Sequence, residues 1–418
     1  MHPFLIELIF MEEKKFVPKL RFSGFDDEWK SFKLSEISER ITRKNKSLET
    51  DRPLTISAQY GLVDQIEYFN KIVASKSLIN YYLLNKGEFA YNKSYSNGYP
   101  FGAVKRLDNY ENGAISTLYI CFDVNDKMNS DLLKEYFETD KWHKEIYKIA
   151  VEGARNHGLL NIAVGDFFNT KHVLPTNPKE QRKLADFLIQ INKKIDLLEK
   201  KYENYQEFKK YLMQQIFAQK LRFDFDSEWI SVKLKDIAKI TGGKRMPKGS
   251  SLINEPNNHP YITVSNMNNN FEDLSTYQYV PTEIYPQIKN YIVDYNDLII
   301  SVAGTLGLVK KVPKCLNKAN LTENANRISE IQINIDYLQY FLNTTQIQNR
   351  ILAVQTNNAQ PKLALKEIRN FKIEYPPTEE QEKIVNFISN VDKKINLIDN
   401  NLMNIQNFKK GLLQQMFV

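Results

Sequence analysis

Two segments of the chain carry apolar residues at alternating steps of four and three. The positions are Leu184, Leu188, Ile191, Ile195, Leu198, Tyr202 and Tyr205 in residues 178–217, and Ile384, Ile388, Val391, Ile395, Ile398, Leu402 and Ile405 in residues 379–417. This spacing predicts an α-helix with one apolar seam that packs against a second helix. We therefore expect two long helices, each of roughly 38 residues and about 57 Å.

The seam changes phase at the same place in both segments, after Tyr205 and after Ile405. The simplest way to bury both seams is to pair the two helices, and the internal repeat favours an antiparallel arrangement. The alternative is that each apolar stripe is buried on its own globular domain. The sustained spacing and the polar residues at the outer heptad positions favour the paired helices.

The repeat extends through the whole chain. KLRFSGFDDEWKSFKLSEI at residues 19–37 returns as KLRFDFDSEWISVKLKDI at residues 220–237. At the other end of each half, EQRKLADFLIQINKKIDLL corresponds to EQEKIVNFISNVDKKINLI. We expect the repeated Trp29 and Trp229 to anchor each globular part to the helices. A repeat on this scale indicates one structure used twice.

The stretches between the repeated segments match only in outline. Each contains β-branched runs, at residues 53–61 and 260–268, followed by a strand, a glycine-rich loop and a basic strand at residues 86–107 and 296–312. Helices are predicted at residues 132–146 and 336–351. The predicted fold class is α+β: two α/β domains separated by two long antiparallel coiled-coil helices, with a pseudo-twofold internal repeat. The predicted segments are 1–24 (N-terminal), 25–175 (first domain), 176–218 (central helix), 219–376 (second domain) and 377–418 (C-terminal helix).

Composition and charge indicate the kind of partner and the cellular compartment to expect. With 418 residues, 42% of them hydrophobic, the chain is long enough for two or three domains. Its net charge of +7 favours an acidic partner such as nucleic acid. There is no apolar run of the ~18 to 20 residues that span a membrane, and the first ten residues lack the features of a secretory signal. We expect a cytoplasmic protein with no membrane partner; the natural start is Met1 or Met11.

Motifs for catalysis and for metal binding are absent from the sequence. It contains no GxxxxGK[ST], GxSxG, HExxH or CxxC, the five histidines do not cluster, and Cys121 and Cys315 lie far apart. No segment of the NPPY type suggests amino-methylation. We expect no catalytic residue, no metal site and no cofactor bound by this chain.

The paired KLRF and EQ segments resemble those of the specificity subunits of type I restriction-modification systems, and the resemblance covers residues 17–418. It implies that the two divergent stretches are target recognition domains, each specific for half of a split double-stranded DNA sequence. It also implies that the helices set the spacer and bind two methyltransferase subunits. The restriction and translocase subunits would be further partners, and S-adenosylmethionine and ATP would be bound by partner subunits.

Residues that can contact DNA are sought in the polar loops, where Lys and Arg bind phosphates and Asn, Arg and Thr recognise base edges. The candidates are Arg43, Lys44, Lys46, Asn92, Lys93, Tyr95, Asn97, Arg155 and Asn156 in the first domain, and Lys244, Arg245, Lys248, Asn266, Asn268, Thr305, Asn324 and Asn326 in the second. Each loop taken singly is also compatible with a solvated turn. Two other functions stay open: a DNA methyltransferase or nuclease with a duplicated domain, and a coiled-coil scaffold that binds no DNA.

Overall fold

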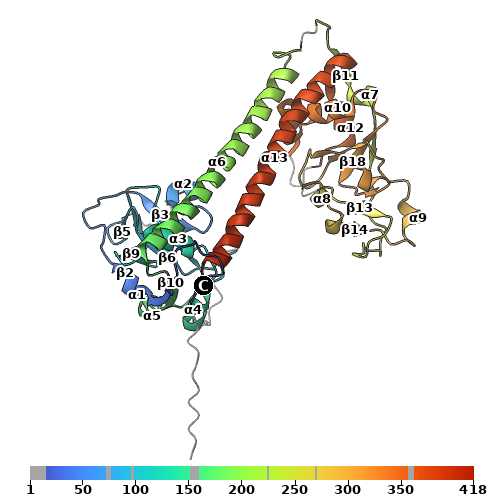
Figure 1. Ribbon diagram of the computed structural model, residues 1–418. Coiled ribbons are helices and arrows are strands. Elements are labelled where there is room, and N and C mark those ends of the chain that lie inside the picture. Colours follow the sequence, from blue (N-terminus) through green and yellow to red (C-terminus); the bar gives the residue numbers. More distant parts are fainter. Residues whose placement is uncertain are drawn as a thin grey trace, which may run out of the picture. The chain divides into compact units, whose positions relative to one another are not determined.

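The computed structural model describes residues 16–71, 77–95, 98–150, 160–223, 226–268, 271–355 and 362–418 (Figure 1). The chain divides into two compact units, unit 1 with Met1–Glu199 and Asn400–Val418, and unit 2 with Lys200–Asp399. Each unit contains one globular head and parts of two long helices, α6 (Pro178–Phe217) and α13 (Thr378–Met416). We call residues 16–177 head 1 and residues 218–377 head 2.

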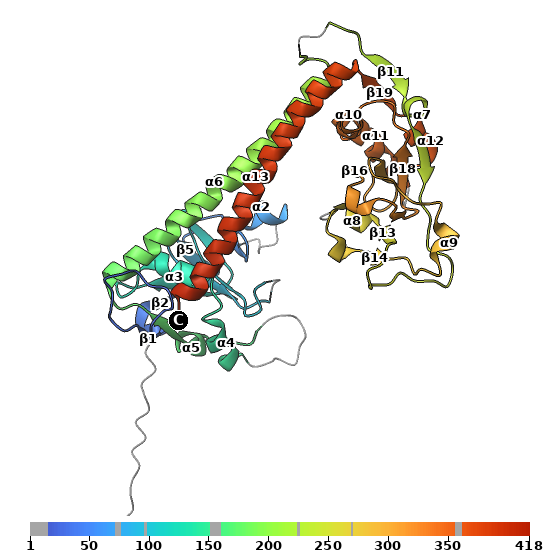
Figure 2. The same ribbon diagram turned by 45° about the vertical axis from the view of Figure 1, so that its right-hand side comes forward.

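The two long helices pack antiparallel within each unit. In unit 1 the side chain of Gln406 donates a hydrogen bond to Glu199 Oε1 at 3.3 Å, so the second half of α13 lies beside the middle of α6. In unit 2 Lys209 Nζ lies 2.5 Å from Asp392 Oδ1, which places the second half of α6 beside the start of α13. Both ribbon views show the helices side by side (Figures 1 and 2). The predicted antiparallel pair is confirmed.

The seams are buried in two different ways. Leu184 and Leu188 lie in the core of head 1, and Ile384 and Ile388 lie in the core of head 2, all 1% exposed or less. The alternative of a stripe buried on its own domain therefore holds for the first turns of each helix. Of the remaining seam residues, Ile191, Val391, Ile395 and Ile398 are buried, and Ile195, Leu198, Tyr202, Tyr205, Leu402 and Ile405 are half-buried.

Head 1 is built on two four-stranded sheets. The first is antiparallel, in the order β2 (Ser38–Ile41), β9 (Ile120–Val124), β6 (Phe89–Asn92) and β7 (Ala103–Arg106). The second has the order β4 (Gly61–Asp64), β3 (Pro53–Ser57), β8 (Asn112–Ile115) and β5 (Tyr82–Asn85), with β3 and β8 parallel. Its apolar core includes Trp29, Phe89 and Phe122 from the head together with Leu412 and Phe417 from the end of the chain.

Head 2 repeats this strand order, except that among the described residues its second sheet has three strands and no counterpart of β5. Its antiparallel sheet has the order β12 (Lys239–Gly242), β18 (Ala325–Ser329), β15 (Leu298–Ser301) and β16 (Val309–Lys311). Its second sheet has the order β14 (Gln278–Tyr279), β13 (Pro260–Ile262) and β17 (Asn320–Leu321), with β13 and β17 parallel. The match in strand order confirms the predicted structural repeat.

A two-stranded ladder joins each head to its long helix. These ladders are β1 (Lys30–Lys33) with β10 (Lys171–Leu174) and β11 (Ile230–Lys233) with β19 (Lys372–Tyr375). The short helices are α1 (Leu34–Ile37), α2 (Gln65–Phe69), α3 (Ser130–Tyr136), α4 (His143–Ile149) and α5 (Val164–Phe168) in head 1, and α7 (Leu234–Ile237), α8 (Val264–Asn268), η1 (Leu274–Thr276), α9 (Tyr285–Ile288), η2 (Lys314–Leu316), α10 (Ile335–Leu342), α11 (Thr345–Gln355) and α12 (Leu365–Arg369) in head 2.

The helices predicted at residues 132–146 and 336–351 are each two helices, α3 and α4 in head 1 and α10 and α11 in head 2. At the break in head 1 the Thr139 hydroxyl donates to Tyr136 O at 2.7 Å, and in head 2 the Thr344 hydroxyl donates to Phe341 O at 2.7 Å. A threonine hydroxyl that bonds a nearby carbonyl competes with the helical hydrogen bond. The apolar periodicity alone did not predict this break.

Candidate nucleic-acid interface

Four polar loops of head 2 meet at one edge of the β12–β18–β15–β16 sheet. They follow β12, β13 and β15 and precede β18. Gly243 N donates to Ala325 O at 3.1 Å and Val302 N donates to Asn324 O at 2.7 Å, so the backbone ties three of the loops together. The structure thus brings together the loops of head 2 that carry the DNA-contacting residues predicted from the sequence.

The fourth loop joins through side chains. Asn268 Nδ2 donates to Thr305 Oγ1 at 3.3 Å, and both residues are exposed. An exposed amide next to a hydroxyl presents donors and acceptors of the kind that recognise base edges in a groove. We call this the Asn268–Thr305 pair.

The loop after β12 adds basic side chains to head 2. Arg245 is 80% exposed, and its Nε lies 2.6 Å from Glu323 Oε1. Burial acts to raise the pKa of the Glu323 carboxyl, but its hydrogen bonds with Arg245, Thr322 and its own backbone, together with the Arg245 charge, lower that pKa overall. Lys244 is exposed with its Nζ 5.5 Å from the centroid of the Tyr291 ring, and Lys248 is exposed. Lysines placed in this way can contact phosphates, whereas Arg245 must first exchange Glu323 for a phosphate.

The three other nominated asparagines of head 2 are less accessible. Asn266 is buried; its Oδ1 accepts from Thr263 N at 2.9 Å and its Nδ2 donates to Thr276 O at 3.2 Å. Asn326 is 6% exposed within β18, and Asn324 is half-buried. The hydrogen bonds of Asn266 indicate that this side chain holds its own loop together.

In head 1 the connection from β6 to β7 carries a second set of nominated residues. Asn92 ends β6, and its Oδ1 accepts from Ser94 N at 3.0 Å. Lys93 is half-buried, and Tyr95 is 61% exposed. A Cβ on Gly102, whose φ is +77°, would lie 2.0 Å from Asn92 O, so only glycine lets the returning chain come this close. The loop is therefore held tightly at its base and presents an aromatic ring.

The first nominated loop of head 1 is largely engaged within the head. Arg43 Nη2 donates to both carboxylate oxygens of Glu88, at 2.6 and 2.5 Å, and Lys44 Nζ donates to Asn80 O at 2.9 Å. Lys46 is exposed. Glu88 immediately precedes β6, whereas Asn92 ends it. Asn97, Arg155 and Asn156 lie outside the described residues.

Two residues near the loops of head 2 were not predicted from the sequence as candidates. Asn290 and Tyr291 line a cleft of about 550 Å³ beside β12, together with Arg327 and Arg369. Tyr291 also carries Lys244 over its ring. In the sequence Tyr291 stands between an asparagine and a β-branched run. This pattern is also typical of a core strand, so it does not by itself predict a binding residue.

The described residues hold no group of three or more His, Cys, Asp or Glu side chains arranged to bind a metal ion. Within the same residues, no helix has the length and apolar content to cross a membrane.

Known proteins of one family are similar to this chain. The family model for the type I restriction modification DNA specificity domain matches residues 226–407. The specificity subunit of the type I restriction enzyme EcoBI of Escherichia coli is 26% identical over 165 residues, which cover 37% of this chain and 34% of that protein. The MjaVIII specificity subunit of Methanocaldococcus jannaschii is 22% identical over 321 residues, 72% of each chain. The chain thus aligns with about a third of the first relative and most of the second.

Solved structures share the fold. The S subunit of a type I restriction-modification system from M. genitalium has a TM-score of 0.55 at 15% identity, and the match covers 96% of this chain and 99% of that one. A chain from a structure on complex assembly and conformational transition of the type I R-M system has a TM-score of 0.56 at 17% identity and covers 93% and 97%. The likeness over nearly the whole chain confirms the predicted fold class.

Proposed function

We infer that this chain belongs to the specificity subunits of type I restriction-modification systems and selects the DNA sequence on which such a complex acts. Each head would recognise one half of a bipartite, asymmetric double-stranded target, and the helix pair would set the unread spacer. One observation carries this proposal: the two heads share strand order, including the parallel pair, but differ in the side chains on their loops. Head 2 presents the Asn268–Thr305 pair, and head 1 presents Asn92 and Tyr95.

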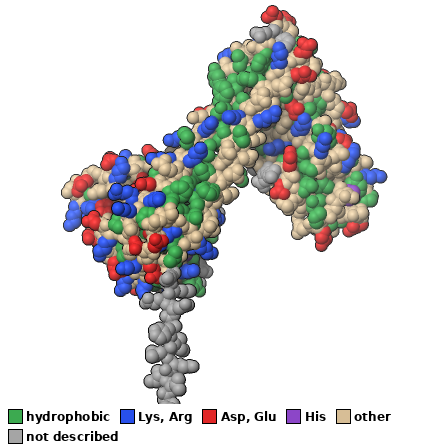
Figure 3. Space-filling view, viewed as in Figure 1, with side chains coloured by type: hydrophobic (Ala, Val, Ile, Leu, Met, Phe, Trp, Pro, Cys, Tyr) green, Lys and Arg blue, Asp and Glu red, His purple; other side chains and the backbone are tan. Residues whose placement is uncertain are grey.

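The long helices offer equivalent surfaces for two modification (methyltransferase) subunits. Leu197 and Phe408 of unit 1 are 64% and 57% exposed, and their counterparts Leu397 and Phe208 of unit 2 are 53% and 46% exposed. Figure 3 shows hydrophobic side chains gathered along the long helices. Exposed apolar residues that recur in both copies of a repeat support the binding of two copies of one partner.

The reaction chemistry would belong to the partners. We propose that this chain is not catalytic, that S-adenosylmethionine and ATP bind to the modification and restriction or translocase subunits, and that the complex works in the cytoplasm. The lack of catalytic sequence motifs supports this assignment over a methyltransferase or nuclease with a duplicated domain.

The test is selection of duplexes from a random pool by the chain assembled with its modification subunits, followed by methylation assays. We expect one bipartite motif with a fixed gap. The double variant Asn268→Ala with Thr305→Ala should weaken the discrimination between bases in one half-site by about 1–3 kcal/mol of binding free energy. The preference in the other half-site should not change. Methylation by the chain alone would support the duplicated enzyme, and the absence of salt-dependent duplex binding would support the scaffold.

A further inference from the structure

Three positions at the junction of head and helices can be compared between the two units. Asn129 N donates to Gln181 Oε1 at 2.9 Å, and Asn334 N donates to Gln381 Oε1 at 2.9 Å, which aligns α3 with α10. The alignment makes Tyr340 the counterpart of Glu135. On the long helices Asp392 is the counterpart of Asn192, and Lys209 is the counterpart of Lys409.

In unit 1 the carboxylate of this junction belongs to the head. Glu135 on α3 is 2% exposed. Lys409 Nζ of α13 lies 2.8 Å from Glu135 Oε2, and Asn192 Nδ2 of α6 donates to Glu135 Oε1 at 2.7 Å. One buried carboxylate therefore binds both long helices to the head. We call these three residues junction 1.

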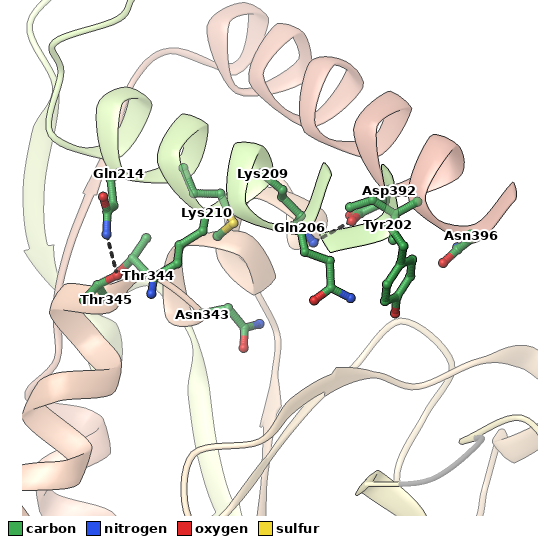
Figure 4. Close-up of a pocket in the computed structure, with 12 residues that line it drawn as sticks. Tyr202, Gln206, Lys209, Lys210, Gln214, Asn343, Thr344, Thr345, Asp392 and Asn396 are labelled. Carbon is green, nitrogen blue, oxygen red and sulfur yellow. Dashed lines mark hydrogen bonds and ion pairs between the residues drawn. The ribbon is translucent and has the colours of Figure 1, made fainter. Parts of the chain in front are cut away.

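In unit 2 the carboxylate belongs to the helix. Asp392 Oδ1 of α13 lies 2.5 Å from Lys209 Nζ of α6, and the pair borders a cleft of about 500 Å³ (Figure 4). The Tyr340 hydroxyl of α10 donates to Asp392 Oδ2 at 2.8 Å. Burial, together with this hydrogen bond, raises the pKa of Tyr340, so the phenol keeps the proton that it donates. We call these three residues junction 2.

The lysine is thus constant, while the carboxylate and its neutral partner have changed sides. A head of the Glu135 type on a helix of the Asp392 type would place two carboxylates around one lysine. A head of the Tyr340 type on a helix of the Asn192 type would leave the partly buried Lys409 without a carboxylate. Both mismatches are costly, because a like charge or an unpaired charge in a partly desolvated site is unfavourable.

We propose that residues 135 and 192 in unit 1, and 340 and 392 in unit 2, determine which head docks on which helix pair. The matched surface is intramolecular, and it does not depend on the DNA-binding role proposed above. A head transplanted into the other half docks correctly only when the helix residue at 192 or 392 is exchanged with it.

The test moves the carboxylate of junction 1 from the head to the helix in the full-length chain. The variants are Glu135→Gln, Asn192→Asp and the double variant, which has the same shapes with the acid and the amide exchanged. They are made in a Trp229→Phe background, because the two remaining tryptophans, Trp29 and Trp142, are buried in head 1 and report on unit 1 alone. Asn404→Asp, an exposed position of α13 in unit 1, is the matched control.

We expect each single variant to raise the unfolding equilibrium constant of unit 1 at least about ten-fold. The double variant should return to within about three-fold of the background chain, and Asn404→Asp should have no effect. Additive losses in the double variant, or a neutral Asn192→Asp, would overturn the proposal. If Glu135→Gln does not fold alone, recovery of folding on adding Asn192→Asp supports the proposal, and failure to recover refutes it.

Discussion

Arg21 Nε lies 2.7 Å from Glu180 Oε1, so the KLRF segment at the start of the repeat is bound to the EQ segment at its end. The indole of Trp29 donates to the same Glu180 oxygen at 3.3 Å. In unit 2 Arg222 Nη2 lies 2.7 Å from Glu380 Oε2 in the same way. The repeated motifs are therefore the two sides of one structural contact, which explains why both motifs recur although the loops between them do not.

Removal of the arginine should destabilise unit 1. The side chains of Arg21 and Glu180 are 11% and 1% exposed, so Arg21→Ala leaves a buried carboxylate with the neutral Trp29 indole as donor but without its cationic partner. We expect a loss of about 3 kcal/mol in the free energy of unfolding. Tryptophan fluorescence during urea unfolding of the Trp229→Phe chain measures it, with the exposed Lys19→Ala as control. Equal effects of the two substitutions would contradict the role of the pair.

Two adjacent glycines should differ sharply in their tolerance of alanine. A Cβ on Gly243 would lie 2.0 Å from Thr322 O, whereas a Cβ on Gly242 would meet only Asn326 Oδ1, at 3.6 Å. Gly243→Ala must push apart the loops that hold Lys244 and Asn324, because a backbone oxygen cannot yield as a flexible side chain does. We expect at least about ten-fold weaker duplex binding by the assembled complex, a change of roughly 1.4 kcal/mol.

Gly242→Ala is the control for this experiment and should bind duplexes as the parent chain does. Normal binding by Gly243→Ala would show that the convergence of loops in head 2 is not needed for DNA recognition.

Head 1 should lose stability in mild acid. His172 is 1% exposed between the Tyr136 hydroxyl and the Thr170 hydroxyl, and burial lowers the pKa of its imidazole to about 4. The imidazole is therefore neutral in the folded head and gains a proton on unfolding below its ordinary pKa of about 6.5. The free energy of unfolding of head 1 therefore does not depend on the protonation of His172 above about pH 6.5. Below that it falls toward pH 4, by at most about 1.4 kcal/mol per pH unit.

Unit 2 supplies the control for this acid sensitivity. The residue paired with Val232 is Ile373, in the place where His172 pairs with Phe32. Hydrogen exchange, corrected for the intrinsic effect of pH, should show protection of β10 falling relative to β19 between pH 7 and pH 5. Parallel changes in both ladders would assign the acid sensitivity to some other group.

Much of this architecture was predictable from the sequence, because the seam of α6 and α13 and the repeated motifs have strong local signatures. The site was less predictable. Arg43 looked available for phosphate but forms two hydrogen bonds with Glu88, a residue 45 positions away. Asn266 was predicted to contact a base, but its side-chain amide is hydrogen-bonded to backbone groups of head 2. Such outcomes depend on tertiary partners that no local pattern encodes.

The length of the helix pair should control the spacing of the DNA target. Deletion of one heptad around Leu198 and another around Ile398 preserves the four-three spacing and shortens both helices by about 10 Å. We expect the unread gap in the selected motif to shrink by about three base pairs. Deletion of three residues from each helix breaks the spacing and should instead impair folding. An unchanged gap after the heptad deletion would show that the length of the helices does not set the spacing of the half-sites.

The most direct test of the proposed function is the pattern of methylated bases in the genome of cells with and without this gene. We expect one asymmetric, two-part motif that is methylated only when the gene is present. In cells that carry Asn268→Ala with Thr305→Ala, the motif should change in one half alone. Identical methylation with and without the gene, in cells shown to produce the assembled complex, would contradict the proposal that this chain selects the DNA target.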